Sequence, residues 1–238
     1  MIDPRPTTIL LDVGFTLTFP DHQVIAGHAA TAGLTVDAGL LARTEEVLRR
    51  EIVLYPWAST PSQVATRPRA AGADFFRRML DLAGVAGSNE SLNAVATFIW
   101  ERHLERNVWC RVGAGVERAV ARLRDAGMRL AVVSNSEGTV EAMLNEVGLA
   151  RYFDTILDSW VVGVAKPDPG IFHLALKRLG VQAADAVMLG DVPKFDVDGA
   201  RAAGVRAVLI DPLNLHPNID VPRTPDLGTF VEALLGPS

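Results

Sequence analysis

Four short polar signatures in the sequence carry the side chains from which a metal-assisted site for an anion could be built. They are marked by Asp12, Ser134, Lys166 and Asp191, and Asp196 follows five residues after the last of them. Carboxylates can hold Mg²⁺, which requires oxygen ligands in a near-octahedral arrangement. A hydroxyl and an ammonium can bind the oxygens of an anion and balance its charge. These residue types therefore predict chemistry on an anionic substrate.

The signatures stand at or shortly after the ends of runs that have the pattern of buried parallel strands. The runs are short, continuous and apolar, as expected for strands covered on both faces. In sheets of this kind the ligand lies outside the carboxyl ends of the strands, where the polar residues stand here. We predict strands over residues 7–13, 129–134, 155–158, 186–190 and 206–210.

Helical patterns alternate with these strands in the second half of the chain. Gly127, Gly148 and Gly180 mark helix ends there, because glycine favours the position after a helix. We predict helices over residues 114–126, 138–147, 169–179, 195–203 and 226–235. Strands and helices in alternation predict an α/β fold, with a doubly wound, Rossmann-like parallel sheet.

The stretch between the first two strands has helical patterns and no candidate for a parallel strand. We predict helices over residues 24–33, 38–54, 73–83 and 91–106, with a loop around Pro56, Pro61, Pro68 and Gly72. The stretch therefore predicts an all-helical insert. We expect a core domain of residues 1–18 and 109–238, and an inserted domain of residues 19–108.

The order of the signatures resembles that of the haloacid dehalogenase-like (HAD) hydrolase superfamily, whose members are mostly phosphatases. Its pattern is a nucleophilic Asp, a Ser or Thr, a Lys and an acidic metal-binding pair. The stretch Lys166-Pro-Asp-Pro-Gly-Ile-Phe172 is similar to the third motif, and Gly190-Asp191-Val-Pro-Lys-Phe-Asp196 to the fourth. The resemblance covers essentially the whole chain. It implies that the helical insert is a cap over the site.

The resemblance implies a role for each signature residue. Asp12 is expected to form an aspartyl-phosphate and Lys166 to balance the charge of the transferring group. Ser134, Asn135 and Lys166 are expected to bind the phosphate oxygens. The ligands implied for Mg²⁺ are Asp12, the backbone carbonyl of Gly14, Asp191 and Asp196.

One departure from the family pattern lies at Gly14. Family phosphatases usually carry there a second Asp, which protonates the leaving group and then activates water. Losing general acid catalysis costs ~10²–10⁴-fold in rate. We therefore predict slow turnover, biased toward acyl and aryl phosphates. Asp21, His22 and His28 are candidate replacements for the acid, although Asp21 and His22 also suit a solvated turn.

Three functions remain open at this point. The first is a Mg²⁺-dependent phosphatase acting on a small phosphorylated metabolite. The second is a dehalogenase-type C–halogen hydrolase, because that branch of the family also lacks the second Asp. The third is a non-catalytic binding protein on a HAD scaffold. A phosphonatase is disfavoured, because residues 19–108 contain no lysine for a Schiff base. Arg67 and Arg69 are candidate contacts for an anionic substrate.

Composition limits the remaining possibilities. The chain has 238 residues, 49% of them hydrophobic, which is enough for a large core. Its net charge of −5 gives no basic footprint for nucleic acid. Cys110 stands alone, which excludes an internal disulfide, and no run is long enough to span a membrane. We expect a cytoplasmic protein, a monomer or a homodimer, with a small anionic substrate and neither nucleic-acid nor membrane partners.

Overall fold

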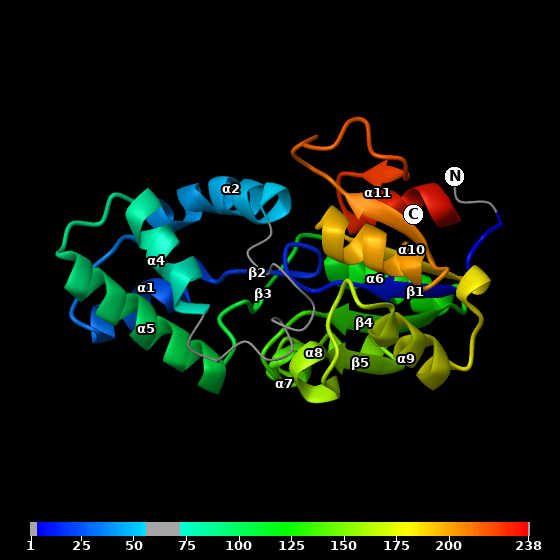
Figure 1. Ribbon diagram of the computed structural model, residues 1–238, viewed down its shortest axis with the longest axis horizontal. Helices are drawn as coiled ribbons and strands as arrows, with labels where there is room; N and C mark the ends of the chain where they lie inside the picture. The colour runs from blue at the N-terminus through cyan, green and yellow to red at the C-terminus, as the bar shows by residue number, and fades with distance from the viewer. Residues whose placement is uncertain (1–3, 56–71, 238) are drawn as a thin grey trace.

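The computed structural model describes residues 4–55 and 72–237, which form an α/β core and a helical cap beside it (Figure 1). The core is a six-stranded parallel sheet in the order β5-β4-β1-β6-β7-β8. Its strands are β1 (Thr8–Leu11), β4 (Arg129–Ser134), β5 (Thr155–Asp158), β6 (Ala186–Gly190), β7 (Arg206–Ile210) and β8 (Arg223–Thr224). The predicted α/β class is confirmed.

Both faces of the sheet are covered by helices, so the strands are apolar on both sides. Along β1, the side chains of Ile9 and Leu11 join one hydrophobic cluster and that of Leu10 joins another. The first cluster packs against α6 (Val116–Asp125), α7 (Val140–Glu146) and α11 (Leu227–Leu235). The second packs against α9 (Pro169–Leu179) and α10 (Asp198–Ala202). This is the doubly wound arrangement that the alternating pattern predicted.

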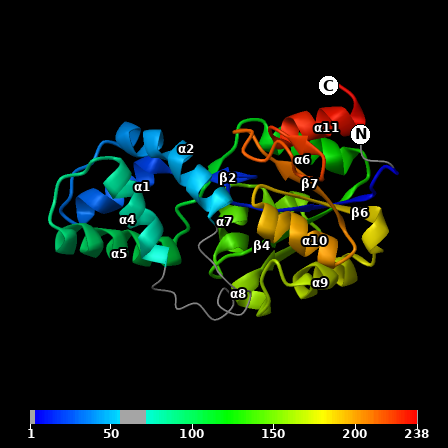
Figure 2. The same ribbon diagram turned by 45° about the horizontal axis from the view of Figure 1, so that its top comes forward.

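The cap consists of α1 (His22–Thr31), α2 (Ala38–Leu54), α4 (Ala73–Leu82) and α5 (Asn89–Glu105). These helices enclose a hydrophobic cluster of their own, centred on Leu41, Phe76 and Ile99. Both views place them beside one end of the sheet (Figures 1 and 2). The chain enters the cap through β2 (Thr18–Phe19) and leaves it through β3 (Arg111–Val112), which pair with each other antiparallel.

Most of the predicted strands have the expected bounds, whereas some short elements were missed. The first strand is shorter than predicted, and the helix expected over 195–203 is divided into a π-turn (Pro193–Val197) and α10. The strands β2, β3 and β8 and the short α8 (Ser159–Val162) were not predicted, because elements of two to four residues show no periodicity. The predicted loop at Pro56, Pro61 and Pro68 lies outside the described residues. Within residues 4–55 and 72–237, no helix is long and apolar enough to cross a bilayer.

Candidate active site

Three of the predicted site carboxylates meet at the carboxyl ends of the two central strands. Asp12 follows β1, and its backbone N–H donates to the carbonyl of Leu189 in β6 at 2.9 Å. Asp191 follows β6, and Asp196 lies in the π-turn beyond it. One oxygen from each of these three carboxylates lies within 4.8 Å of the others. Residues far apart in the sequence thus form one acidic cluster.

Lys166 lies inside this cluster. Its Nζ donates to Oδ1 of Asp12 at 2.6 Å and to Oδ1 of Asp196 at 2.7 Å, and its side chain is only 2% exposed. The backbone around it is held by Asn135, whose side-chain amide exchanges two hydrogen bonds of 2.8 Å with the N–H and C=O of Lys166. The side-chain amide of Asn135 therefore positions the backbone of the lysine. The phosphate contact predicted for Asn135 stays a prediction.

The proximity of these charges changes their protonation equilibria. Burial raises the pKa of Asp12 to about 6, although Lys166 opposes the rise. Burial, reinforced by Asp12 and Asp196, also raises the pKa of Asp191 well above its ordinary value. Burial alone would lower the pKa of Lys166, but the carboxylates of Asp12 and Asp196 outweigh it and raise that pKa. The lysine is therefore charged, and the acidic cluster attracts further positive charge.

The acidic cluster has the chemistry of a Mg²⁺ site. Oδ2 of Asp191 is buried and accepts no hydrogen bond among the described residues, and the cation beside it is Arg49, whose Nε lies 3.5 Å away. A buried carboxylate oxygen that accepts no hydrogen bond is costly unless cations compensate it. The three carboxylates supply hard oxygen donors of the kind that Mg²⁺ prefers. Asp12, Asp191 and Asp196 are thus suited to the metal; the part of the Gly14 carbonyl stays a prediction.

Glycine at position 190 allows the carboxylate of Asp196 to lie against the backbone. A β-carbon at Gly190 would lie 2.2 Å from Cγ of Asp196, which is far inside van der Waals contact. Oδ2 of Asp196 accepts a hydrogen bond of 2.9 Å from the N–H of Val192. The side chain is thereby fixed with its other oxygen on Lys166. The π-turn that carries Asp196 is of a type often found at functional sites.

Ser134 ends β4 and is buried at the same edge of the sheet. The loop after it donates its N–H groups within the protein: that of Ser136 to Oγ of Ser159, and those of Gly138 and Val140 to Oδ2 of Asp158. These three N–H groups are therefore not part of an anion site. The phosphate contact predicted for Ser134 itself stays a prediction.

The candidate replacements for the missing acid do not join the cluster. Asp21 is the N-cap of α1, where Oδ1 accepts from the N–H groups of Gln23 and Val24. His22 lies 3.4 Å from Glu45. His28 lies on α1 near the charges of α5, and its pKa is lowered, chiefly by burial. Asp21 and His22 therefore have structural partners. The solvated turn expected for them is wrong for His22, which is buried in the first turn of α1.

One cationic residue of the site was missed from the sequence. Arg49 of α2 reaches from the cap, with Nη2 donating to the carbonyl of Phe15 at 3.0 Å and Nε 3.5 Å from Oδ2 of Asp191. Arg67 and Arg69, the candidates named from the sequence, lie outside the described residues. Arg49 gave no signal because it stands in a helix with other charged residues, and nothing in the periodicity marks which of them faces the core.

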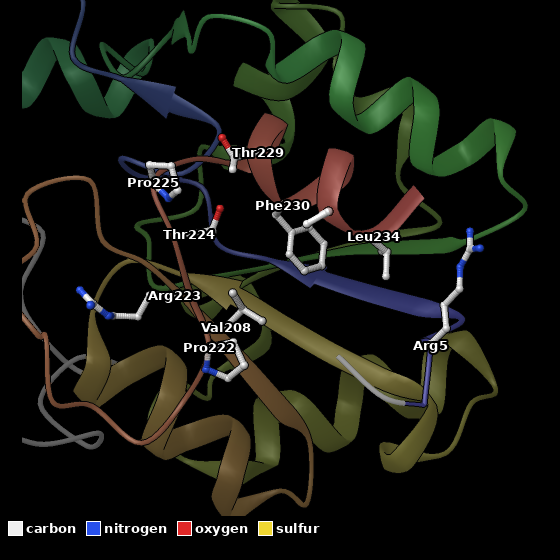
Figure 3. A pocket seen from close by; sticks show the side chains of 10 residues that line it. Arg5, Val208, Pro222, Arg223, Thr224, Pro225, Thr229, Phe230 and Leu234 are labelled. Carbon is white, nitrogen blue, oxygen red and sulfur yellow. The ribbon is translucent and has the colours of Figure 1, made fainter. Parts of the chain in front are cut away.

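The structure also has a hollow of about 540 Å³ that holds none of the site residues (Figure 3). It lies between α11 and the sheet edge at β7 and β8. Its lining includes Arg5, Val208, Pro222, Thr224, Phe230 and Leu234. Because no member of the carboxylate cluster lines it, its size alone does not make it the centre of the chemistry.

Several known proteins are similar to this chain in sequence or in fold. The family model of haloacid dehalogenase-like hydrolases matches residues 6–204. A phosphoserine phosphatase of Thermus thermophilus is 34% identical, over 79% of this chain and 81% of its own length. The magnesium-bound putative HAD-hydrolase YfnB of Bacillus subtilis has a TM-score of 0.68 at 20% identity, covering 97% of this chain and 99% of its own.

A 2-haloacid dehalogenase of Pseudomonas syringae pv. Tomato has a TM-score of 0.58 at 25% identity, covering 96% of this chain and 98% of its own. Phosphatases and dehalogenases thus both occur among the similar proteins. The match to the family model spans most of the sequence, and the Thermus relative aligns over most of both chains. This protein belongs to the haloacid dehalogenase-like hydrolase family.

Proposed function

We propose that the protein is a Mg²⁺-dependent phosphatase that hydrolyses a small phosphorylated metabolite through an aspartyl-phosphate on Asp12. The observation that carries the proposal is the position of Asp12. Its carboxylate is hydrogen-bonded to Lys166, and one of its oxygens lies within 4.8 Å of an oxygen of each of two further carboxylates. A buried nucleophile beside both a fixed cation and a site suited to a metal matches the needs of phosphoryl transfer, which depends on positioning and charge stabilisation.

In the first step, an ionised oxygen of Asp12 attacks phosphorus, and the leaving-group oxygen departs with the electron pair of the P–O bond. In the second, water attacks the phosphorus of the aspartyl-phosphate and releases inorganic phosphate and Asp12. Lys166 keeps Asp12 oriented and balances its charge, and Ser134 is proposed to bind a phosphate oxygen. Bound Mg²⁺ would supply positive charge against the phosphoryl oxygens. The ligands proposed for it are Asp12, the Gly14 carbonyl, Asp191 and Asp196.

The cap is proposed to complete the site. We divide the chain into a core of residues 1–18 and 109–238 and a cap of residues 19–108, with substrate bound where they meet. Support comes from Arg49, a cap residue whose guanidinium lies beside Asp191 and the carbonyl of Phe15. A guanidinium at this junction can bind an anionic group of the substrate.

The first test is hydrolysis of p-nitrophenyl phosphate and acetyl phosphate, each with Mg²⁺ and with EDTA. Turnover is expected only with Mg²⁺, and Asp12→Asn is expected to abolish it. Asp198→Asn is the matched control, because Asp198 is exposed and lies near the cluster in sequence. Metal-independent turnover, or full activity of Asp12→Asn, would contradict the proposal.

A second candidate is hydrolysis of a carbon–halogen bond. Gly14 favours it, because a halide leaves without a proton, and a 2-haloacid dehalogenase is among the similar structures. The acidic cluster weighs against it, because displacement of halide by Asp12 does not require a metal. Release of chloride from 2-chloropropionate in EDTA, lost in Asp12→Asn, would establish this alternative and replace the first.

A further inference from the structure

The indole of Trp109 lies against the position that a β-carbon at residue 14 would take. A β-carbon on Gly14 would lie 3.3 Å from Cζ3 of Trp109 and 3.6 Å from Cε3. The shorter distance is inside the optimal separation of two carbon atoms, about 3.5–4.0 Å. The φ angle of Gly14 is not positive, so its backbone conformation is open to other residues. The ring, and not the backbone, is therefore what opposes a side chain here.

Trp109 is held in place at the junction of cap and core. Its backbone N–H donates to Oδ1 of Asn107 at 2.8 Å, and the side-chain amide of Asn107 donates to Oγ1 of Thr139 in the core at 2.9 Å. Its ring lies 4.9 Å from that of Phe15 and 5.2 Å from that of Phe75, between centroids. Contacts on both sides limit how far the indole can move.

Phe15 contributes to the same aromatic wall and is itself in an unusual conformation. Its φ is +53°, in the left-handed region that bulky residues rarely adopt. Its ring lies edge-on to Trp109 and beneath the guanidinium of Arg49, 5.3 Å from its Cζ. Strain of this kind persists only where the surroundings hold it, and it is concentrated at functional sites. Gly14 and Phe15, two and three residues after Asp12, therefore carry no carboxyl group. The aromatic rings of Phe15 and Trp109 lie there instead.

We propose that the indole of Trp109 excludes an acidic side chain from position 14, so that the site selects phosphate esters whose leaving group departs unprotonated, above all aryl phosphates. The inference rests on the proposed phosphatase function. When Asp12 attacks phosphorus, the P–O electron pair leaves with the aryl oxygen as an aryloxide, which takes its proton from solvent afterwards. An alkoxide is a much stronger base and leaves poorly without an acid.

The steric part is tested by thermal unfolding of Gly14→Ala with and without Trp109→Leu. Gly→Ala at a compatible position raises the melting temperature by restricting the unfolded chain, whereas overpacking lowers it. The contact with Trp109 therefore decides whether the melting temperature of Gly14→Ala rises or falls. We expect the melting temperature to fall by about 4 °C in the wild-type background, and to stay or rise with Trp109→Leu. Gly27→Ala is the control, because nothing lies within 4 Å of its β-carbon position and its φ is not positive. It should raise the melting temperature equally in both backgrounds.

The specificity part is tested with phenyl phosphate and cyclohexyl phosphate, which have similar size and different leaving-group acidity. We expect the wild type to prefer phenyl phosphate by ~10²–10⁴-fold in kcat/KM, the usual value of general acid catalysis. In Gly14→Asp with Trp109→Leu, the preference should fall at least ~10-fold, through a rise in kcat for cyclohexyl phosphate. Trp109→Leu alone should leave the preference unchanged, since it adds no acid.

If Trp109→Leu does not fold, Trp109→Met serves in the same two measurements. Equal melting shifts for Gly14→Ala in both backgrounds, or a preference that the double variant leaves intact, would overturn the inference while the phosphatase function stands. A wild type that hydrolyses neither these esters nor acetyl phosphate would overturn the function, and the specificity with it. Loss of the aryl preference in the double variant, together with a melting shift that depends on Trp109, is the result expected.

Discussion

Arg49 of the cap places its Nε 3.5 Å from Oδ2 of Asp191 in the core. The same side chain is only 12% exposed, whereas that of its neighbour Arg50 is 48% exposed and pairs with Glu46 on the helix surface. Two adjacent arginines of one helix therefore have different surroundings. Arg49 brings the cap into contact with the acidic site, whereas Arg50 does not. Substitutions of these two arginines therefore form a matched pair.

Arg49→Gln is expected to raise KM for a phosphate ester by ~10–100-fold. Hydrogen bonds to charged groups contribute about 1.5–3 kcal/mol, and each tenfold change corresponds to about 1.4 kcal/mol. Arg50→Gln should leave KM within about twofold, because exposed ion pairs contribute little. Steady-state kinetics of both variants checks the prediction. Similar changes in both would show that the position of Arg49 has no special role in binding.

Lys166→Met is expected to destabilise the protein strongly. Removing one partner of a buried ion pair costs ~3–5 kcal/mol, because the carboxylates of Asp12 and Asp196 would lose their cation. For a protein of this size, about 10 °C in melting temperature corresponds to that loss. Lys177→Met on the exposed side of α9 is the control and should change it by less than about 2 °C. A melting temperature unchanged by Lys166→Met would argue against the buried pairing.

Asp12→Asn is expected to stabilise the metal-free protein, and more so at pH 7 than at pH 4. The pKa of Asp12 is raised from 3.8 to about 6, so the folded state is favoured while the group is protonated. The stabilising contribution of protonated Asp12 is complete below pH 3.8, the pKa of the group in the unfolded state. It is lost as the pH rises through about 6, the pKa in the folded state. Asn is neutral throughout, so its advantage over Asp should grow by up to ~3 kcal/mol between these pH values.

Urea unfolding in EDTA at pH 4 and pH 7 measures this difference, with Asp198→Asn as a control that should show no such trend. With Mg²⁺ added, the order should reverse, because a ligand that binds only the folded wild type stabilises it. A difference between wild type and Asp12→Asn that is independent of pH would place the pKa of Asp12 in its ordinary range.

Gly190→Ala is expected to weaken Mg²⁺ binding as well as stability. The added β-carbon would lie 2.2 Å from Cγ of Asp196, so this carboxylate must move away from Lys166 and Val192. Overpacking typically costs ~1–3 kcal/mol. Isothermal titration with Mg²⁺ should show at least ~10-fold weaker binding, whereas Gly27→Ala should bind as the wild type does. Unchanged affinity in Gly190→Ala would mean that Asp196 is not a ligand.

The sequence by itself determined the α/β class and the bounds of most of the buried strands, as well as the positions of four polar signatures. Short continuous apolar runs such as 129–134 and 186–190 are typical of strands covered on both faces, and residues at the carboxyl ends of parallel strands meet at one edge of the sheet. That local rule is enough to predict that Asp12 and Asp191 share a site, whereas Lys166 stands eight residues after β5 and its role was implied by the family resemblance.

Only the tertiary structure decided which residues of the cap, and of its junction with the core, reach that site. Arg49 and Trp109 are 37 and 97 positions after Asp12, and no spacing rule connects them to it. Their places depend on how the cap packs against the core, which is a sum of many contacts between distant segments. Contacts between distant segments also decide the role of Asn135, whose side-chain amide holds the backbone of Lys166. They likewise place Gly14 beside the indole of Trp109, which opposes a side chain at this position.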